Sequence, residues 1–202
     1  MHIQFAGRSE ASIYHVLTQT AIPRPIAWVL TGAAVTGVPL NVAPFSFFTP
    51  IASDPPQLAF SIGNRLAGRE KDTDRNSPIG APVVIHIPNA LQAEAVTLSA
   101  RPLPPEESEL PDMGRDGELV DWDFPLPRLA ECPVAYGGIV TRRIELGSVP
   151  GHQVLVIVEA SCVWVRDSAY EVDAEGRTRI DPLEINPLSR LGSGRFATTW
   201  AL

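Results

Sequence analysis

Four short blocks decide the fold of this chain: RPIAWVLT at 24–31, NVAPFSFF at 41–48, SIGNR at 61–65 and KDTDRN at 71–76. Between them lie apolar runs of strand length that Gly and Pro interrupt, a pattern typical of an antiparallel sheet. The blocks also concentrate small polar and cationic side chains. This combination predicts a sheet protein with a polar site along these blocks.

Lys71 is the first candidate for a ligand contact, because it is the only lysine among the sixteen basic residues. It opens KDTDRN, the most polar of the blocks. A compact ammonium with three donors suits a phosphate group, and nearby hydroxyls and turn amides can complete such a site. The alternative is that Lys71 opens a surface helix and touches only water, since a single cation specifies little.

The rest of the chain predicts more strands and a few helices. One helix is expected from an N-cap at Ser9 to about Thr18, one from Leu91 to Ala100, and a short one at 71–81 that ends at Pro78. Strands are expected at 25–31, 41–53, 57–63, 82–88, 134–146 and 152–165. Such a set indicates a barrel or sandwich decorated by helices, formed by residues 1–202 as a single domain.

The charge of the chain is concentrated in one segment. The net charge is −7, and residues 106–123 carry eight acidic side chains against Arg115 alone, so the remainder is balanced. Without a basic stripe to replace phosphate counterions, nucleic acid binding is disfavoured. The Pro-rich, acidic residues 101–131 are expected to run over the surface as a solvated loop.

The two cysteines and the N-terminus indicate the cellular compartment. Cys132 and Cys162 lie far apart and match no CxxC pattern, so no disulfide framework is expected, and Cys162 is expected to be buried. Residues 1–11 do not resemble a signal peptide, and no apolar run approaches the ~20 residues that span a membrane. A protein of the reducing cytoplasm, with no membrane partner, is predicted.

The usual catalytic motifs give little support. GSGRFA at 192–197 matches the glycine fingerprint of dinucleotide-binding folds, but it follows no strand and opens no convincing helix, so we reject it. The four histidines are scattered, and His86 is expected to be a sheet residue whose ring is hydrogen-bonded rather than a metal ligand. We predict no metal site and no catalytic side chain. A bound cofactor would then carry any chemistry.

The order and spacing of the blocks resemble the flavin reductase-like family, which comprises FMN-binding split β-barrel proteins of the flavoredoxin type. The resemblance runs through PRPIAWVLT, NVAPFSFF, DPPQLAFSIGNR and KDTDRN, continues in LQAEAVTLSA, CPVAY, EVDAEGRTRIDPL and PLSRLGSGRFA, and covers about residues 13–197. It implies a mainly β fold, a six-stranded, Greek-key-like split barrel with a few flanking α-helices. It also implies a homodimer with flavin near the subunit boundary.

The resemblance further implies where FMN would bind. The ring would pack along the backbone of 26–31 and 41–47. The phosphate would lie toward Ser46, Ser61, Lys71 and Thr73, with Arg24 as a further candidate. The full set of implied cofactor-binding residues is Arg24, Ile26, Ala27, Trp28, Thr31, Asn41, Val42, Ala43, Pro44, Phe45, Ser46, Phe47, Ser61, Ile62, Gly63, Lys71, Asp72, Thr73, Asn76 and Arg190. Alternatively, Arg24 caps the first helix or pairs with an acid across the dimer, and Arg190 pairs with the acidic segment.

The implied activity is that of an NAD(P)H-dependent flavin reductase. NADH or NADPH would deliver hydride to flavin N5, and the electrons would pass to free flavin, a partner monooxygenase or another acceptor. The protein would supply proximity and orientation. Two alternatives stay open: a non-catalytic FMN-binding or electron-carrier module, and a related barrel that binds another cofactor.

Overall fold

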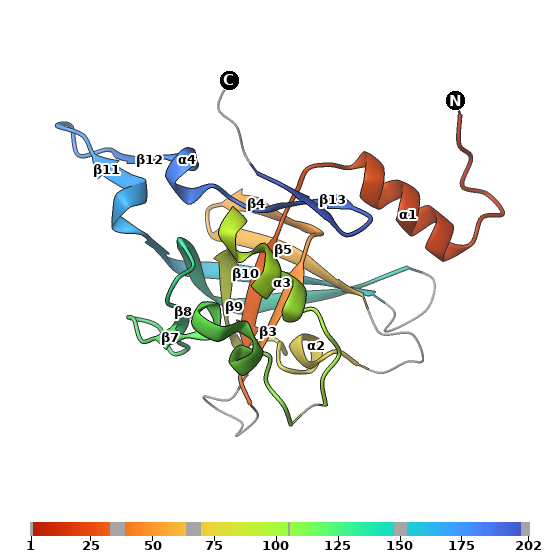
Figure 1. Ribbon diagram of the computed structural model, residues 1–202, viewed down its shortest axis with the longest axis horizontal. Helices are drawn as coiled ribbons and strands as arrows, with labels where there is room; N and C mark the ends of the chain where they lie inside the picture. The colour runs from red at the N-terminus through yellow and green to blue at the C-terminus, as the bar shows by residue number, and fades with distance from the viewer. Residues whose placement is uncertain (1, 33–38, 64–69, 105, 148–152, 199–202) are drawn as a thin grey trace.

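The computed structural model describes residues 2–32, 39–63, 70–104, 106–147 and 153–198 (Figure 1). Its centre is an antiparallel sheet in the order β3-β2-β6-β9-β10-β5-β4. The strands of this sheet are β2 (Ala27–Thr31), β3 (Asn41–Phe45), β4 (Phe48–Ser53), β5 (Pro56–Gly63), β6 (Pro82–Ile87), β9 (Val134–Leu146) and β10 (Gln153–Val165). The six extended runs predicted from the sequence are all present.

The sheet closes on itself because its two edge strands are consecutive in the chain. Only Ser46 and Phe47 separate β3 from β4. At this bend the Ser61 N–H donates to the Phe47 carbonyl at 2.9 Å, which ties the bend to β5. A single run, Asn41 to Ser53, therefore joins both ends of the sheet and curls it into a barrel of six extended segments. The predicted mainly β split barrel is confirmed.

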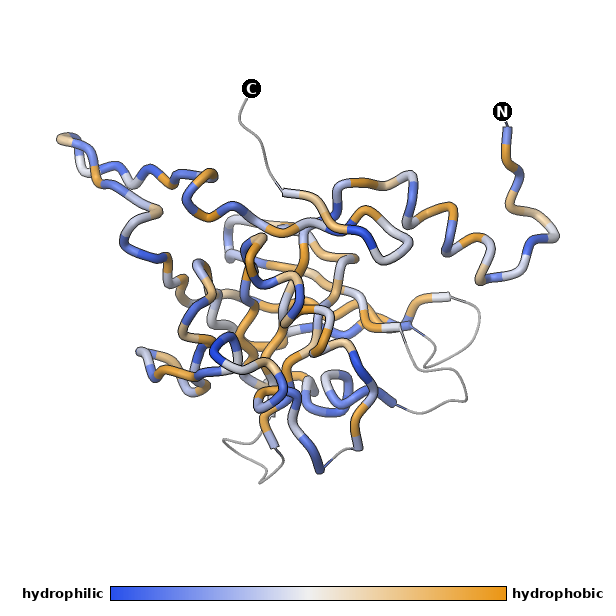
Figure 2. Tube along the Cα trace, viewed as in Figure 1, coloured by the Kyte–Doolittle hydropathy of each residue, from blue (hydrophilic) through white to orange (hydrophobic). Residues whose placement is uncertain are grey.

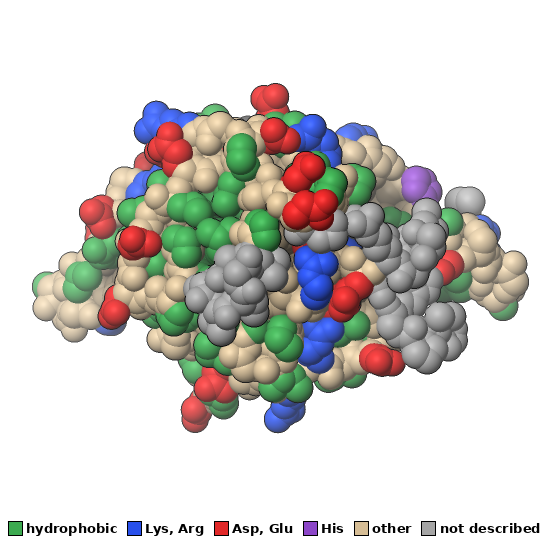
Figure 3. Space-filling view, turned by 90° about the horizontal axis from the view of Figure 1, so that it is seen from below, with side chains coloured by type: hydrophobic (Ala, Val, Ile, Leu, Met, Phe, Trp, Pro, Cys, Tyr) green, Lys and Arg blue, Asp and Glu red, His purple; other side chains and the backbone are tan. Residues whose placement is uncertain are grey.

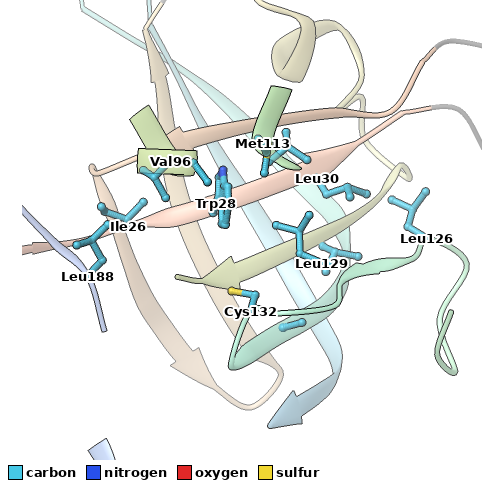
Figure 4. Packing of buried hydrophobic residues seen from close by; sticks show 13 residues of the cluster. Ile26, Trp28, Leu30, Val96, Met113, Leu126, Leu129, Cys132 and Leu188 are labelled. Atoms are coloured by element: carbon cyan, nitrogen blue, oxygen red, sulfur yellow. The ribbon is translucent and has the colours of Figure 1, made fainter. Parts of the chain in front are cut away.

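Two buried clusters lie on opposite faces of the sheet, and β2 contributes to both. Ala27 and Val29 belong to the cluster inside the barrel, whereas Trp28 and Leu30 belong to an outer cluster. Successive side chains of a strand point to opposite faces, so a strand buried on both sides reads as one apolar run. Figure 4 shows Trp28 in the middle of the outer cluster, with Val96 on one side.

The helices begin where the sequence places their caps. α1 (Glu10–Thr20) starts after Ser9, whose side chain accepts the Ser12 N–H. Asn89 opens a capping box at η1 (Ala90–Gln92), which continues into α3 (Ala93–Leu98). The other elements are β1 (Arg24–Pro25), α2 (Asp72–Arg75), η2 (Leu110–Gly117), β7 (Leu119–Val120), β8 (Arg128–Leu129), η3 (Asp167–Ala169), β11 (Tyr170–Val172), β12 (Thr178–Ile180), α4 (Pro182–Ile185), β13 (Ser189–Gly192) and β14 (Arg195–Ala197). The expected helices are confirmed with small shifts at their ends.

The acidic segment 101–131 corrects one prediction. The sequence favours a solvated surface loop, but Met113, Leu126 and Leu129 of this segment are buried in the outer cluster (Figure 4). Most of its acidic side chains are exposed, as expected. The apolar residues that anchor the segment to the barrel follow no regular period, so the sequence pattern does not indicate their burial.

GSGRFA forms a β-hairpin. It spans the end of β13, a turn in which Ser193 and Gly194 have φ of 48° and 77°, and β14. A strand–turn–helix unit is therefore not formed at this motif.

The apolar residues concentrate in the central strands, while α1 and the β11–β12 hairpin project from the body (Figures 1 and 2). Both cysteines are free; Cys132 is buried, whereas Cys162 is half-buried rather than buried as expected. Within the described ranges, no helix combines the length and apolarity needed to cross a bilayer. The segments GAAVTG (32–37) and GSVPG (147–151), whose composition is typical of turns, fall largely outside the described residues.

Candidate functional site

A pocket of about 450 Å³ lies between β3, α2 and the chain that follows α3. Its volume is within the range of small-molecule sites, roughly 300–1,000 Å³. It is lined by seven of the predicted site residues, namely Asn41, Ala43, Pro44, Phe45, Lys71, Asp72 and Thr73. Five further residues line it: Ser99, Ala100, Arg101, Pro102 and Glu109. Three separate parts of the chain thus meet at one cavity.

Thr73 is presented to the pocket by two hydrogen bonds. The Asn41 side-chain amide donates to Thr73 Oγ1 at 2.9 Å, and the Ser77 hydroxyl donates to the Thr73 carbonyl. Asn41 and Thr73 are both buried. Because Thr73 Oγ1 accepts from Asn41, its own proton can be donated to a ligand, which is the polarity that an anionic oxygen requires.

Lys71 lies against the aromatic wall of the pocket. Its Nζ is 5.7 Å from the centroid of the Phe45 ring, within the range of a cation–π contact. The adjacent Asp72 pairs with Arg75 at 2.7 Å. Lys71 therefore lines the pocket, whereas the alternative places it on a surface helix where it touches only water.

Arg143 on β9 holds the block KDTDRN against the barrel. Its guanidinium pairs with the Asp74 carboxylate at 2.5 Å and donates to the carbonyls of Asp74 and Ser77. Asp74 is buried. Sequence reasoning missed Arg143, because it lies about seventy residues from its partners and no local pattern links them.

The remaining predicted site residues do not line this pocket. They are Arg24, Ile26, Ala27, Trp28, Thr31, Val42, Ser46, Phe47, Ser61, Ile62, Gly63, Asn76 and Arg190. The apolar ones on β2 are fully buried, and β2 pairs with β3 on one side and β6 on the other. Both edges of this strand are therefore used by the sheet. The apolar residues of β2 therefore form part of the barrel against which the pocket lies.

Arg24 and its neighbours form a separate polar group. The Arg24 guanidinium donates to the carbonyls of Thr18 and Ala21 at the end of α1, and its Nε donates to the Ser46 hydroxyl at 3.4 Å. The helix-capping alternative for Arg24 is confirmed. Arg190 lies opposite Arg24 in the backbone pairing of β1 with β13. Its guanidinium lies over the Phe196 ring.

Three predicted polar residues have other surroundings. Ser61 Oγ accepts from the Gln153 amide at 2.7 Å. Thr31 Oγ1 and Asn76 Nδ2 are buried with no hydrogen-bond partner in the described part of the chain. Thr31 is paired with Asn41 and Asn76 ends α2, so both flank pocket residues. Buried polar atoms without a partner cost free energy, which keeps these two as candidates for a ligand or water contact.

His86 has a structural place in the core, as predicted. Its Nδ1 is 3.0 Å from the Trp28 carbonyl, and its Nε2 accepts the Leu129 N–H at 2.9 Å. The ring is thus neutral with its proton on Nδ1. Burial, as the largest cause, lowers the pKa of His86 to about 4. The contact to Leu129 also fastens the acidic segment to the barrel.

The residues that the sequence did not predict come from the chain after α3. Ser99 accepts from Trp28 Nε1 at 2.8 Å, which fixes this wall to β2. Arg101 pairs with Asp112 near the opening. Ser99 lies in LQAEAVTLSA, so the resembling blocks could have suggested it, whereas no motif marks Arg101 or Glu109. Figure 3, seen from below, shows basic and acidic side chains close together beside an apolar area.

These features fit a flavin mononucleotide. The donors Lys71 and Thr73 suit a phosphate, and the apolar wall from Ala43 to Phe45 suits a planar ring. In the described ranges, no cluster of three or more metal-ligating side chains is found.

Comparisons with known proteins agree with this picture. The family model for the flavin reductase like domain matches residues 19–180. An uncharacterized protein of Halalkalibacterium halodurans is 34% identical over 194 residues, covering 94% of this chain and 89% of that protein. The crystal structure of nitrilotriacetate monooxygenase component B from Bacillus cereus has a TM-score of 0.86 and 30% identity, covering 100% of this chain and 96% of that one.

A more distant neighbour shares the fold. The 2-nitrobenzoate 2-nitroreductase of Pseudomonas fluorescens has a TM-score of 0.83 with 23% identity, covering 100% of this chain and 93% of that one. The family model covers most of the chain, and the resemblance inferred from the sequence is confirmed. The chain belongs to the flavin reductase-like family.

Proposed function

We propose that this protein is an FMN-binding oxidoreductase of the flavin reductase type, with NADH or NADPH as electron donor. The observation that carries the proposal is the pocket itself. It sets the Lys71 ammonium and the Thr73 hydroxyl beside the apolar wall of Ala43, Pro44 and Phe45. A phosphate fits the first group and a flat aromatic ring fits the second. Membership of the flavin reductase-like family supports the same ligand.

The protein's own part would be binding and orientation. Once bound, FMN would supply the redox chemistry, taking hydride from the nicotinamide and passing electrons to an acceptor. Lys71 and Thr73 would hold the phosphate, and the wall from Ala43 to Phe45 would fix the plane of the ring and exclude water. No pocket side chain is needed as a general acid or base.

A partner monooxygenase is the acceptor that the comparisons support best, because a similar structure is a monooxygenase component.

A homodimer is proposed as well. Tyr14, Leu17 and Ile22, on and after the projecting α1, are exposed apolar side chains that a second subunit could cover. Sedimentation analysis checks this proposal. We expect the wild type to sediment as a dimer and Leu17→Glu to sediment as a monomer, and a monomeric wild type would contradict the proposal.

The test of function is an anaerobic absorbance titration with FMN, followed by NADH and then NADPH. Binding of FMN and rapid bleaching by one nicotinamide are expected. FMN binding without reduction by either donor would make the protein a carrier or flavin-binding module. No FMN binding at all would remove the site assignment. In the same titration Lys71→Ala should weaken FMN binding, whereas Arg115→Ala, which removes an exposed cation away from the pocket lining, is the matched control and should not.

A further inference from the structure

Glu109 stands apart from the other acidic residues around it. Of the eight acids at 106–123, it alone is buried, with 4% of its surface exposed. It also lines the candidate FMN pocket. Burying a carboxylate is costly unless it is hydrogen-bonded, so its position calls for a contact that repays the desolvation.

One such contact is to the backbone at the start of β3. Glu109 Oε2 accepts the Val42 N–H at 3.2 Å, and the preceding Ser108 donates its hydroxyl proton to the Leu40 carbonyl at 2.6 Å. β3 is an edge strand whose strand partner is β2. The groups of Leu40 and Val42 lie two residues apart, so they point to the same side, away from β2. Two side chains thus occupy the hydrogen-bonding positions of a missing neighbour strand.

This edge carries one wall of the pocket. Asn41, Ala43, Pro44 and Phe45 of β3 all line it, and Asn41 in turn holds the Thr73 hydroxyl. Any shift of β3 would move the apolar wall and the phosphate-side donor together. An unpaired edge strand is otherwise exposed to fraying or to pairing with another chain.

We propose that Ser108 and Glu109 form a side-chain clamp on β3, and that this clamp positions the pocket wall for FMN. The proposal rests on the proposed FMN site. Glu109 acts through β3 and is a positioning residue. Its carboxylate oxygen accepts the Val42 N–H, and a Gln side chain of the same length carries an amide oxygen that can take over this contact.

The test compares Glu109→Ala with Glu109→Gln and with the exposed control Glu107→Gln. Amide exchange of Val42, measured by NMR without FMN, should quicken about tenfold in Glu109→Ala, the ratio that ~1.4 kcal/mol represents. The FMN dissociation constant should rise about tenfold in the same variant. Glu109→Gln should restore both values to within about twofold.

The outcomes separate the clamp from the function. Unchanged Val42 exchange in Glu109→Ala overturns the clamp, and so does a Gln variant as weak as the Ala variant. Unchanged FMN affinity despite faster exchange overturns the positioning role. If wild type binds no FMN, the proposed function fails, while the exchange data still judge the clamp. Ser108→Ala, expected to show smaller changes of the same sign, replaces Glu109→Ala should the latter not fold.

Discussion

Of the three parts of the chain that line the pocket, the block at 71–76 (the first wall) and the acidic segment 101–131 (the second wall) make an instructive comparison. The block at 71–76 was expected to form a site from its composition, and the structure brings Lys71 and Thr73 to the cavity. The acidic segment 101–131 is expected to be solvated, yet it supplies the second wall through Arg101 and Glu109. The first wall consists of neighbours in sequence. The second depends on where a loop packs, and that is decided by contacts remote in sequence.

The two walls are also fastened to the barrel by different chemistry. The block 71–76 is held by the partly buried ion pair between Asp74 and Arg143 and by hydrogen bonds from Arg143 and Asn41. The acidic segment is held by apolar anchors, by the Leu129 N–H on His86 and by the clamp of Glu109 on Val42. Each attachment can be broken separately, so the comparison can be tested.

The largest effect is expected from Arg143→Ala. It leaves the buried Asp74 carboxylate without its cation, which typically costs about 3–5 kcal/mol in a buried pair. Since the Arg143 side chain is 24% exposed, a loss near the lower end, about 3 kcal/mol, is expected in the free energy of unfolding. Urea denaturation measures it. The exposed neighbour Arg142→Ala is the control, and equal stability of the two variants would contradict the anchoring role.

Acid should lower the free energy of unfolding by nearly as much, through His86, which accepts the Leu129 N–H of the acidic segment. The pKa of buried His86 is about 4 in the folded state, against about 6.5 when unfolded. Between these values the unfolded chain binds the proton and the folded chain does not. The stabilisation is therefore complete above pH 6.5 and is lost as the pH falls toward 4, by about 3 kcal/mol.

Denaturation curves from pH 7 to 4 check this expectation. His86→Gln should be less stable at pH 7 and should lose this part of the pH dependence. The exposed His15→Gln serves as the comparison variant. A His86→Gln protein with the same pH profile as wild type would show that other groups cause the acid sensitivity.

Lys71→Ala tests the first wall at the level of the ligand. The loss of one hydrogen bond to a charged group predicts weaker FMN binding by about 1.5–3 kcal/mol. Little change in the melting temperature of the free protein is expected, because Lys71 is the N-cap residue of α2 and its side chain makes no capping hydrogen bond. Unchanged affinity in an absorbance titration would remove Lys71 from the site.

The smallest effect is expected from the exposed acids of the second wall. Neutralising Glu106, Glu107, Asp121 and Asp123 should change FMN affinity less than twofold, because exposed charges are screened. Fluorescence quenching of FMN measures it. A large loss would mean that the whole acidic surface, rather than Glu109, acts on the pocket, and the contrast between the two walls would disappear.

Local patterns in the sequence determined the strands and the polar block, and the family resemblance added the split barrel and the β3 residues of the pocket. Continuous apolar runs such as PIAWVL, and caps such as Ser9, depend on residues close together in the chain, so local patterns predict them. The polar block 71–76 was found for the same reason. The prediction of His86 as a sheet residue with a hydrogen-bonded ring also follows from its place within an apolar strand.

Only the tertiary structure decided which predicted residues share the cavity. The sequence left two places open for Arg24, at the phosphate or at the end of the first helix, and in the structure its guanidinium donates to the carbonyls at the end of α1. Glu109 reads as one acid among eight, and it becomes part of the pocket only because β3 is an edge strand with a backbone donor to satisfy. The pairing of Glu109 with Val42 joins residues 67 positions apart. The free energy of such a pairing depends on burial and geometry, which a local pattern does not contain.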